Sequence, residues 1–134
     1  MANSSNKTTN DVLRALLDTE LKPQKAVHMK RFGVDFEIQA IDGKTVQRVR
    51  DQASYPVKGG GKKLDGDLFG ALLIAKACVS PDWNDKQILS SFGPTAADAI
   101  QNRLLAGEIS KLTEEILNLS GFGDDDEAIE NVKN

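Results

Sequence analysis

The sequence predicts a single, mostly helical α+β domain in which about five helices pack on a small β-sheet. Three observations lead to this fold class. Residues 64–79 are apolar on nearly every side of a helix, so that helix must be buried. Residues 32–40 alternate between apolar and polar side chains, as a strand with one buried face does. Residues 105–119 carry the regular amphipathic pattern of a helix that covers a core.

The chain has 134 residues, which is room for one domain with a real core. We expect residues 1–21 to form a flexible N-terminus with a short amphipathic helix, residues 22–122 the globular domain, and residues 123–134 an acidic, disordered tail. The polar start does not resemble a signal peptide, and the apolar stretch is shorter than the roughly 20 residues that span a bilayer. We therefore expect a cytoplasmic protein without membrane contact.

The first expected helix begins near Asn10, a good N-cap, and ends before Lys22-Pro23. It places four apolar side chains on one stripe: Val12, Leu13, Leu16 and Leu17. The segment LRALL within it has the LxxLL spacing by which short helices dock into a partner's groove. Packing on the protein's own body and docking on a partner both remain open.

Charge is divided unevenly along the chain. Residues 22–63 hold ten Lys and Arg against four acids, whereas residues 64–134 hold five against thirteen. This division indicates either a basic binding surface or charge-complementary contacts between copies or segments. We expect residues 22–31 to be a basic, flexible and solvent-exposed stretch, and it contains His28, the only histidine.

A strand over residues 32–41 is expected next, with one buried row of side chains: Phe32, Val34, Phe36, Ile38 and Ala40. Asp42-Gly43 fits either a hairpin turn or a helix start, and the spacing of Val46, Val49 and Ala53 favours a helix. The glycine-rich residues 58–63 lack the upstream glycine and the Ser or Thr of a phosphate-binding loop. We expect them to connect a hairpin between residues 55–57 and 62–64.

The buried helix is capped by Asp65 or Asp67 and stopped by Ser80-Pro81, and Trp83 is expected to anchor the edge of the core. A short helix follows, and a capping box at Thr95 begins another. The last helix carries a seam with spacings of 4, 3, 4 and 3 residues: Leu105, Ile109, Leu112, Ile116 and Leu119. Internal packing and an intermolecular seam are both compatible with this pattern.

The residue types do not predict an enzyme, because catalysis needs a base held beside an acid or a nucleophile. His28 stands in a basic stretch, Cys78 falls within the buried helix, and Glu114 and Glu115 lie on a solvated helix face. A single histidine without a cysteine or acidic cluster is not a metal site. We therefore expect no catalytic residue, no cofactor and no bound metal.

Three blocks of the sequence resemble the XkdN-like family of phage tail assembly chaperones. They are RFGVDFEIQAIDGKTVQRVRDQA, LDGDLFGALLIAKACVSPDWND and LLAGEISKLTEEILNLSGF, and they span residues 31–122 in the order of the family. The opening Leu-Leu-x-Gly-Glu-Ile and the close Leu-Ser-Gly-Phe of the last block are the most distinctive features. Ala106 stands where the family pattern has proline.

This resemblance implies a chaperone that binds the tape measure protein of a phage tail and keeps it soluble until tail tube subunits displace it. Such proteins act in the bacterial host cytoplasm and are absent from the mature virion. Self-association, or a longer product made by frameshifting, is also implied. The expected client-binding residues are apolar positions on the first and last helices: Leu13, Leu16, Leu17, Ile109 and Ile116.

The alternative function is a small nucleic-acid-binding module that uses the basic region 22–63. Its candidate phosphate contacts are six side chains: Lys25, Lys30, Arg31, Lys58, Lys62 and Lys63. Specific nucleic-acid binding usually also requires a recognition helix or stacking aromatic residues, and no basic helix with interleaved aromatics is visible. Nucleic acid is therefore not the expected partner.

Overall fold

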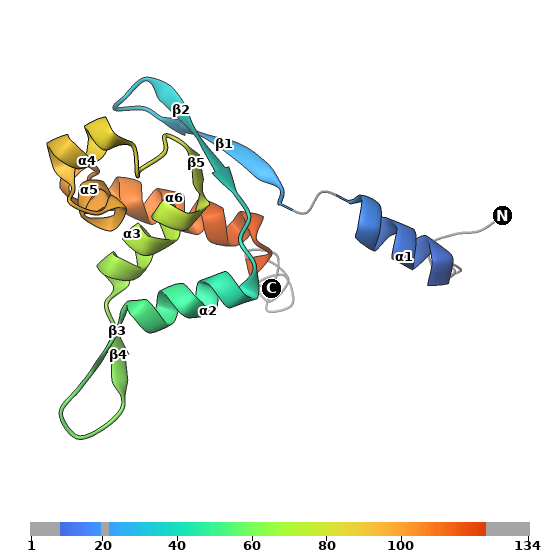
Figure 1. Cartoon of the computed structure of the whole chain (residues 1–134), viewed down its shortest axis with the longest axis horizontal. Helices are drawn as coiled ribbons and strands as arrows, with labels where there is room; N and C mark the ends of the chain where they lie inside the picture. Colours follow the sequence, from blue (N-terminus) through green and yellow to red (C-terminus); the bar gives the residue numbers. More distant parts are fainter. Residues whose placement is uncertain (1–8, 20–21, 123–134) are drawn as a thin grey trace, which may run out of the picture.

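The computed structural model describes residues 9–19 and 22–122, and within them the chain forms six helices and five strands (Figure 1). In chain order these are α1 (Thr9–Asp18), β1 (Gln24–Met29), β2 (Val34–Gln39), α2 (Gly43–Gln52), β3 (Ser54–Pro56), β4 (Lys62–Leu64), α3 (Gly66–Ala77), β5 (Cys78–Ser80), α4 (Lys86–Phe92), α5 (Ala96–Arg103) and α6 (Ala106–Leu119). The predicted α+β class with mostly helical content is confirmed. The polar residues 1–8 and the acidic residues 123–134 lie outside the described residues.

Helix α3 lies at the centre of the domain, as its sequence predicted. It packs against α5 and α6 and, to a smaller extent, against α2. Its buried residues come from several sides of the helix: Phe69, Gly70, Ala71, Leu73, Ile74 and Ala77. The carboxylate of Asp65 accepts a hydrogen bond from the Leu68 amide at 3.1 Å, so Asp65 is the N-cap.

The predicted end of this helix was wrong. The helix ends at Ala77, the Cys78 amide donates the last helical hydrogen bond to the Ile74 carbonyl, and Cys78–Ser80 form strand β5 instead of a further turn. Residue Ser80 precedes Pro81, and the proline ring disfavours helical backbone at the residue before it. The extended residues pair with β2, so the backbone groups released from the helix are used by the sheet.

The main sheet has three antiparallel strands in the order β1-β2-β5. Residue Val27 of β1 is paired with Phe36 of β2, and both side chains are buried, together with Met29 and Ile38. The expectation of a flexible, exposed stretch at residues 22–31 was therefore wrong. Val27 and Met29 of β1 reach the core, whereas the basic residues are exposed, Lys25 on the strand and Lys22, Lys30 and Arg31 outside it.

The sequence placed the start of β2 too early. Phe32 belongs to the tight turn between β1 and β2, where Gly33 adopts φ +68°, a left-handed conformation that favours glycine. Val34 begins the strand with a side chain that is 51% exposed. The predicted inward row is confirmed only for Phe36, Ile38 and Ala40.

Most other helices and strands lie where the capping and turn residues of the sequence predicted them. The ambiguous Asp42-Gly43 starts helix α2, because the Asp42 carboxylate accepts a hydrogen bond from the Thr45 amide at 2.8 Å. Strands β3 and β4 form the predicted hairpin around the glycine-rich loop. Asp85 caps α4 and Thr95 caps α5, and Trp83 is buried beside Phe36.

Replacing Leu73 with alanine should lower the free energy of unfolding by about 2–5 kcal/mol, because Leu73 is fully buried at the centre of α3 and its truncation leaves a cavity. Replacing Leu13 on α1 should lower it by less than about 1 kcal/mol, because Leu13 is 52% exposed. Denaturant unfolding measures both values. A larger loss for Leu13→Ala than for Leu73→Ala would contradict the central position of α3.

Candidate functional site

Helix α1 presents an apolar stripe, formed by Val12, Leu13, Leu16 and Leu17. None of the ten residues of α1 is buried, and Leu16 and Leu17 are 70% and 71% exposed. Figure 1 shows α1 set apart from the helices and strands that surround α3. Large apolar side chains gathered on one exposed helix face are typical of a docking surface.

A second apolar surface lies between α3 and α6. The α3–α6 groove has a volume of about 600 Å³ and runs along one side of α6, bounded also by the end of α5. Its apolar lining residues include Gly70, Leu104, Ile109, Leu117 and Phe122, and its polar ones include Asp67, Ser110 and Glu114. An apolar groove with a polar rim, walled by helices, has the shape and chemistry that accept an amphipathic helix.

Glycine at position 70 sets the depth of this groove. A Cβ atom added there would lie 2.9 Å from Thr113 Oγ1 and 3.1 Å from Ile109 Cγ2, so α6 approaches the α3 backbone closely. Any larger residue would push α6 outward. Gly70 is an isolated glycine inside the apolar helical pattern, between Phe69 and Ala71, and this was the local signal that could have indicated a close helix contact.

The structure separates the five predicted client-binding residues. Leu13, Leu16 and Leu17 share the exposed stripe of α1, whereas Ile109 lines the α3–α6 groove. Ile116 is fully buried in the core together with Leu112, so it is used internally and is not accessible to a partner. The heptad spacing could not distinguish these two isoleucines, because the packing of α6 against α3 decides which of them is enclosed.

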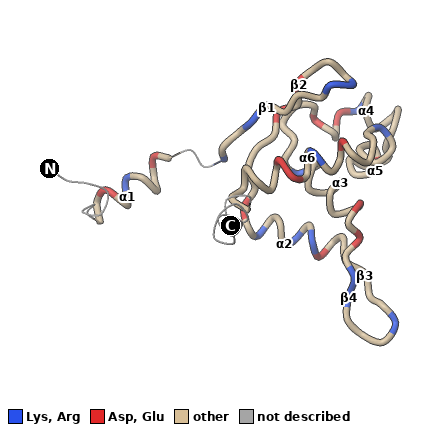
Figure 2. Tube along the Cα trace, turned by 180° about the vertical axis from the view of Figure 1, so that it is seen from behind, with Lys and Arg blue, Asp and Glu red and all other residues tan. Residues whose placement is uncertain are grey.

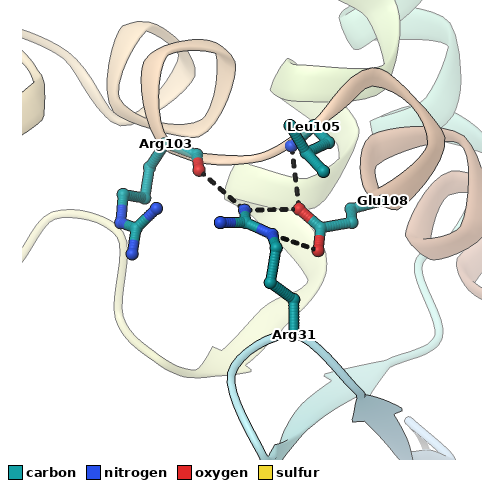
Figure 3. Close-up of polar contacts among 4 residues, drawn as sticks. All are labelled: Arg31, Arg103, Leu105 and Glu108. Carbon is teal, nitrogen blue, oxygen red and sulfur yellow. Dashed lines mark hydrogen bonds and ion pairs between the residues drawn. The ribbon is translucent and has the colours of Figure 1, made fainter.

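The groove wall is held in place by Arg31, from the turn between β1 and β2 (Figure 3). Arg31 Nη2 and Nε donate hydrogen bonds to the two carboxylate oxygens of Glu108 at 2.7 and 2.9 Å, and Nη2 also donates to the Arg103 carbonyl at 3.2 Å. The Leu105 amide donates to the same Glu108 carboxylate at 2.8 Å. Glu108 therefore caps α6 and ties the junction of α5 and α6 to the sheet.

The same network shifts two pKa values. Hydrogen bonding from Arg31 holds the pKa of the Glu108 carboxyl below its ordinary value, with the Leu105 amide and the positive charges of Arg31 and Arg103 acting in the same direction. The hydrogen bond with Glu108 raises the pKa of Arg31 above its ordinary value. Arg31 and Arg103 also lie over the Phe32 ring, at 4.4 and 4.8 Å from its centroid.

Two further contacts join β1 to α6. Lys25 Nζ lies 2.8 Å from Glu115 Oε1, and Lys111 Nζ donates to the His28 carbonyl at 2.8 Å. The uneven charge of the sequence therefore serves contacts between segments, one of the alternatives that the sequence left open. Figure 2 shows Lys and Arg distributed over several elements. Lys62 and Lys63 lie on β4, in the hairpin that projects away from the β1–β2 pair (Figure 1).

In the part of the chain that the structure describes, the reactive residue types do not form a recognisable catalytic arrangement. His28 Nδ1 is 2.8 Å from Asp35 Oδ1, but both side chains are more than half exposed, so water screens the pair. Cys78 is partly buried, and burial raises the pKa of its thiol to about 11. Within residues 9–19 and 22–122, no group of three or more His, Cys, Asp or Glu side chains is placed to hold a metal ion.

In the same residues, no helix is long and apolar enough to cross a membrane.

Comparison with known proteins gives a family match and a structural likeness. The family model described as phage XkdN-like tail assembly chaperone protein matches residues 13–133. The crystal structure of the protein YqbN is similar, with a TM-score of 0.57 over 78% of this chain and 89% of that chain, at 16% sequence identity. At this identity the likeness shows the fold alone. None of the curated proteins matches the chain.

Lowering the pH should destabilise the wild-type protein partly through Glu108. The pKa of the Glu108 carboxyl is lowered in the folded state by its contact with Arg31. The ionised carboxylate therefore stabilises the fold at pH values above the ordinary pKa of 4.5, and this stabilisation is lost as the pH falls through the pKa of the folded state. Glu108→Gln should lower the melting temperature at neutral pH and flatten its dependence on pH below about 5. Glu114→Gln, on an exposed side of the same helix, is the control. An unchanged pH dependence in Glu108→Gln would contradict this role.

Cys78 should react slowly with thiol reagents in the folded protein. Raising its pKa from 9.0 to about 11 lowers the thiolate fraction near neutral pH by roughly a hundredfold. Alkylation by iodoacetamide, followed by mass spectrometry, should become fast only in denaturant. A variant with Cys78→Ala and Ser110→Cys supplies an exposed thiol for comparison, and equal rates for the two thiols in native buffer would be the contrary result.

Proposed function

Because the chain belongs to the family of phage XkdN-like tail assembly chaperones, we propose that it binds the tape measure protein and keeps it soluble until tail tube subunits displace it. It acts in the host cytoplasm, and the finished virion does not contain it. Other copies of the chain, or a longer product made by frameshifting, are further partners within this proposal.

The apolar stripe of α1 is the observation that supports this function best. A tape measure protein is long and helical, so its helices offer apolar faces that aggregate unless they are covered. The α1 stripe offers a complementary helical face in which Leu13, Leu16 and Leu17 are all more than half exposed. Helix–helix contact of this kind needs no active site and can be repeated by many copies along an extended client.

Of the five residues predicted to bind the client, three remain in the proposed contact. Leu13, Leu16 and Leu17 stand together on α1 and are accessible without any change in the fold. Ile116 is removed from the proposal because it is buried, and Ile109 belongs to the α3–α6 groove. The proposed client surface is therefore a single short helix rather than a combination of α1 and α6.

Replacing Leu13 and Leu17 with aspartate should abolish the ability to keep a co-expressed tape measure protein soluble, because a carboxylate buried at an apolar contact costs several kcal/mol. The measurement is the fraction of tape measure protein in the supernatant. The fold should be retained, because α1 has no buried residue, and circular dichroism with thermal unfolding checks this.

Val34→Asp is the matched control, since Val34 is exposed to the same extent as Leu13 but lies on β2. It should leave the soluble fraction of the client unchanged. A folded Leu13→Asp, Leu17→Asp variant that still solubilises its client would remove α1 from the mechanism. Wild-type protein that solubilises no tape measure partner would contradict the proposed function itself.

A further inference from the structure

We infer that the α3–α6 groove binds an amphipathic helix of another protein, and that the apolar face of this helix is bordered by lysine or arginine side chains. The groove is an interaction surface separate from the α1 stripe, and the inference does not depend on binding of the tape measure protein. Three properties of the groove support it: its length, its apolar floor and the charge of its two walls.

The groove follows one side of α6 along most of the helix. Its lining residues begin at Ala106 and recur at intervals of three and four positions, with Ile109, Thr113 and Leu117 among them, as far as Asn118. The twelve steps from Ala106 to Asn118 cover about 18 Å. A partner helix of about twelve residues therefore fits along the groove and can place apolar anchors at intervals of three and four residues.

The floor of the groove has room for those anchors. A Cβ atom added at Gly70 would lie 2.9 Å from Thr113 Oγ1, whereas one added at Gly66 would meet no atom within 4 Å. Helices α3 and α6 are thus in close contact at Gly70, and open space remains beside Gly66. Ile109 and Leu117 are only partly buried, so apolar side chains of a partner would remove them further from water.

Each wall of the groove carries one exposed acid, Asp67 on α3 and Glu114 on α6, and none of the described lining residues is lysine or arginine. Within the described residues, neither carboxylate has a hydrogen-bond or ion-pair partner. Two other acids of α6, Glu108 and Glu115, are already paired with basic residues of the β1–β2 hairpin. The groove therefore favours a ligand with cations on both borders of its apolar face.

Helix α1 of this chain does not have that charge pattern. Its one cation, Arg14, lies three positions after Asp11 and four before Asp18, and so on the same side of the helix as both acids. Helix α1 therefore brings no surplus of positive charge to either border of its apolar stripe. The other described helices belong to the packed domain, so the helix that fits the groove comes from another protein.

The first test titrates the full ¹⁵N-labelled protein with stapled helical peptides of about 14 residues, because unconstrained helices of this length are marginal in water. One peptide has a leucine stripe bordered by lysines, the second has glutamates in place of the lysines, and the third has serines in place of the leucines. The lysine peptide should shift the amide signals of Gly70, Ser110 and Leu117 and leave those of the β3–β4 hairpin unchanged.

The glutamate peptide should bind at least about fivefold more weakly at low salt, because two exposed ion pairs are replaced by two repulsive contacts. The serine peptide should not bind, because the floor of the groove is apolar. A lysine peptide that leaves the groove signals in place up to about 1 mM, or that binds no more tightly than the glutamate peptide, would overturn the inference. So would amide shifts confined to α1.

Variants of the protein test the groove and its charges separately. Ser110→Trp fills the groove and should abolish binding of the lysine peptide. Asp67→Lys with Glu114→Lys should make the glutamate peptide the tighter ligand, and both positions are exposed, so the fold should be retained. Asp18→Lys with Glu37→Lys, which changes the net charge equally but lies away from the groove, should keep the preference for lysine. A preference that the groove variant does not reverse would contradict the inference.

The last measurement asks whether α1 already occupies the groove. Leu13→Asp with Leu17→Asp should leave the groove amide signals of the peptide-free protein, and its affinity for the lysine peptide, unchanged. Movement of those signals or tighter peptide binding would show that α1, from the same or another copy, is the occupant, and would overturn the assignment of an outside partner.

Discussion

The structure depends on the need to bury α3 on every side. A helix that is apolar all round has no face that tolerates water, so other elements must surround it. Helices α2, α5 and α6 supply those partners, and Gly70 leaves room for the Ile109 and Thr113 side chains of α6 against the α3 backbone. Leu112 and Ile116 of α6 are fully buried, whereas Ile109 and Leu117 are only partly buried and line the groove. The groove is the apolar surface that remains after this packing is complete.

A set of charged contacts then decides which side of α6 the sheet occupies. Arg31 binds Glu108 and the Arg103 carbonyl, and Lys25 pairs with Glu115, so the basic β1–β2 hairpin lies along the acidic side of α6. Because Glu108 also accepts the Leu105 amide, the same carboxylate caps the helix and anchors the sheet. With one side of α6 on the core and one on the hairpin, its remaining side is free to form the groove wall. Two ion pairs, Lys25–Glu115 and Arg31–Glu108, thus join the basic segment of the chain to the acidic one.

The exposed stripe of α1 fits the proposed binding of an amphipathic client helix, because it offers an apolar surface that a partner helix can cover. Left uncovered, the exposed stripe of α1 is a liability, because exposed leucines promote aggregation. Under the proposed function, a client helix that covers the stripe removes this liability, and it can bind and leave without unfolding the domain because no residue of α1 is buried.

The sequence by itself determined those elements whose signals are local. The apolar run of α3, the helix starts at Asp42 and Thr95, the β3–β4 hairpin and the amphipathic α1 and α6 could all be predicted, because periodicity and capping act within a few residues. The choice of Asp65 over Asp67 as the cap of α3 was left open by the sequence. The family resemblance was likewise present in the sequence and is confirmed by the family match. Only the tertiary structure decided that residues 24–29 and 78–80 are strands, since both are short and are held by pairing with β2. It also decided that Ile116 is buried whereas Ile109 lines a groove. These two residues share one helical pattern, and the position of α3 against α6, set by contacts distant in sequence, is the physical reason that they differ.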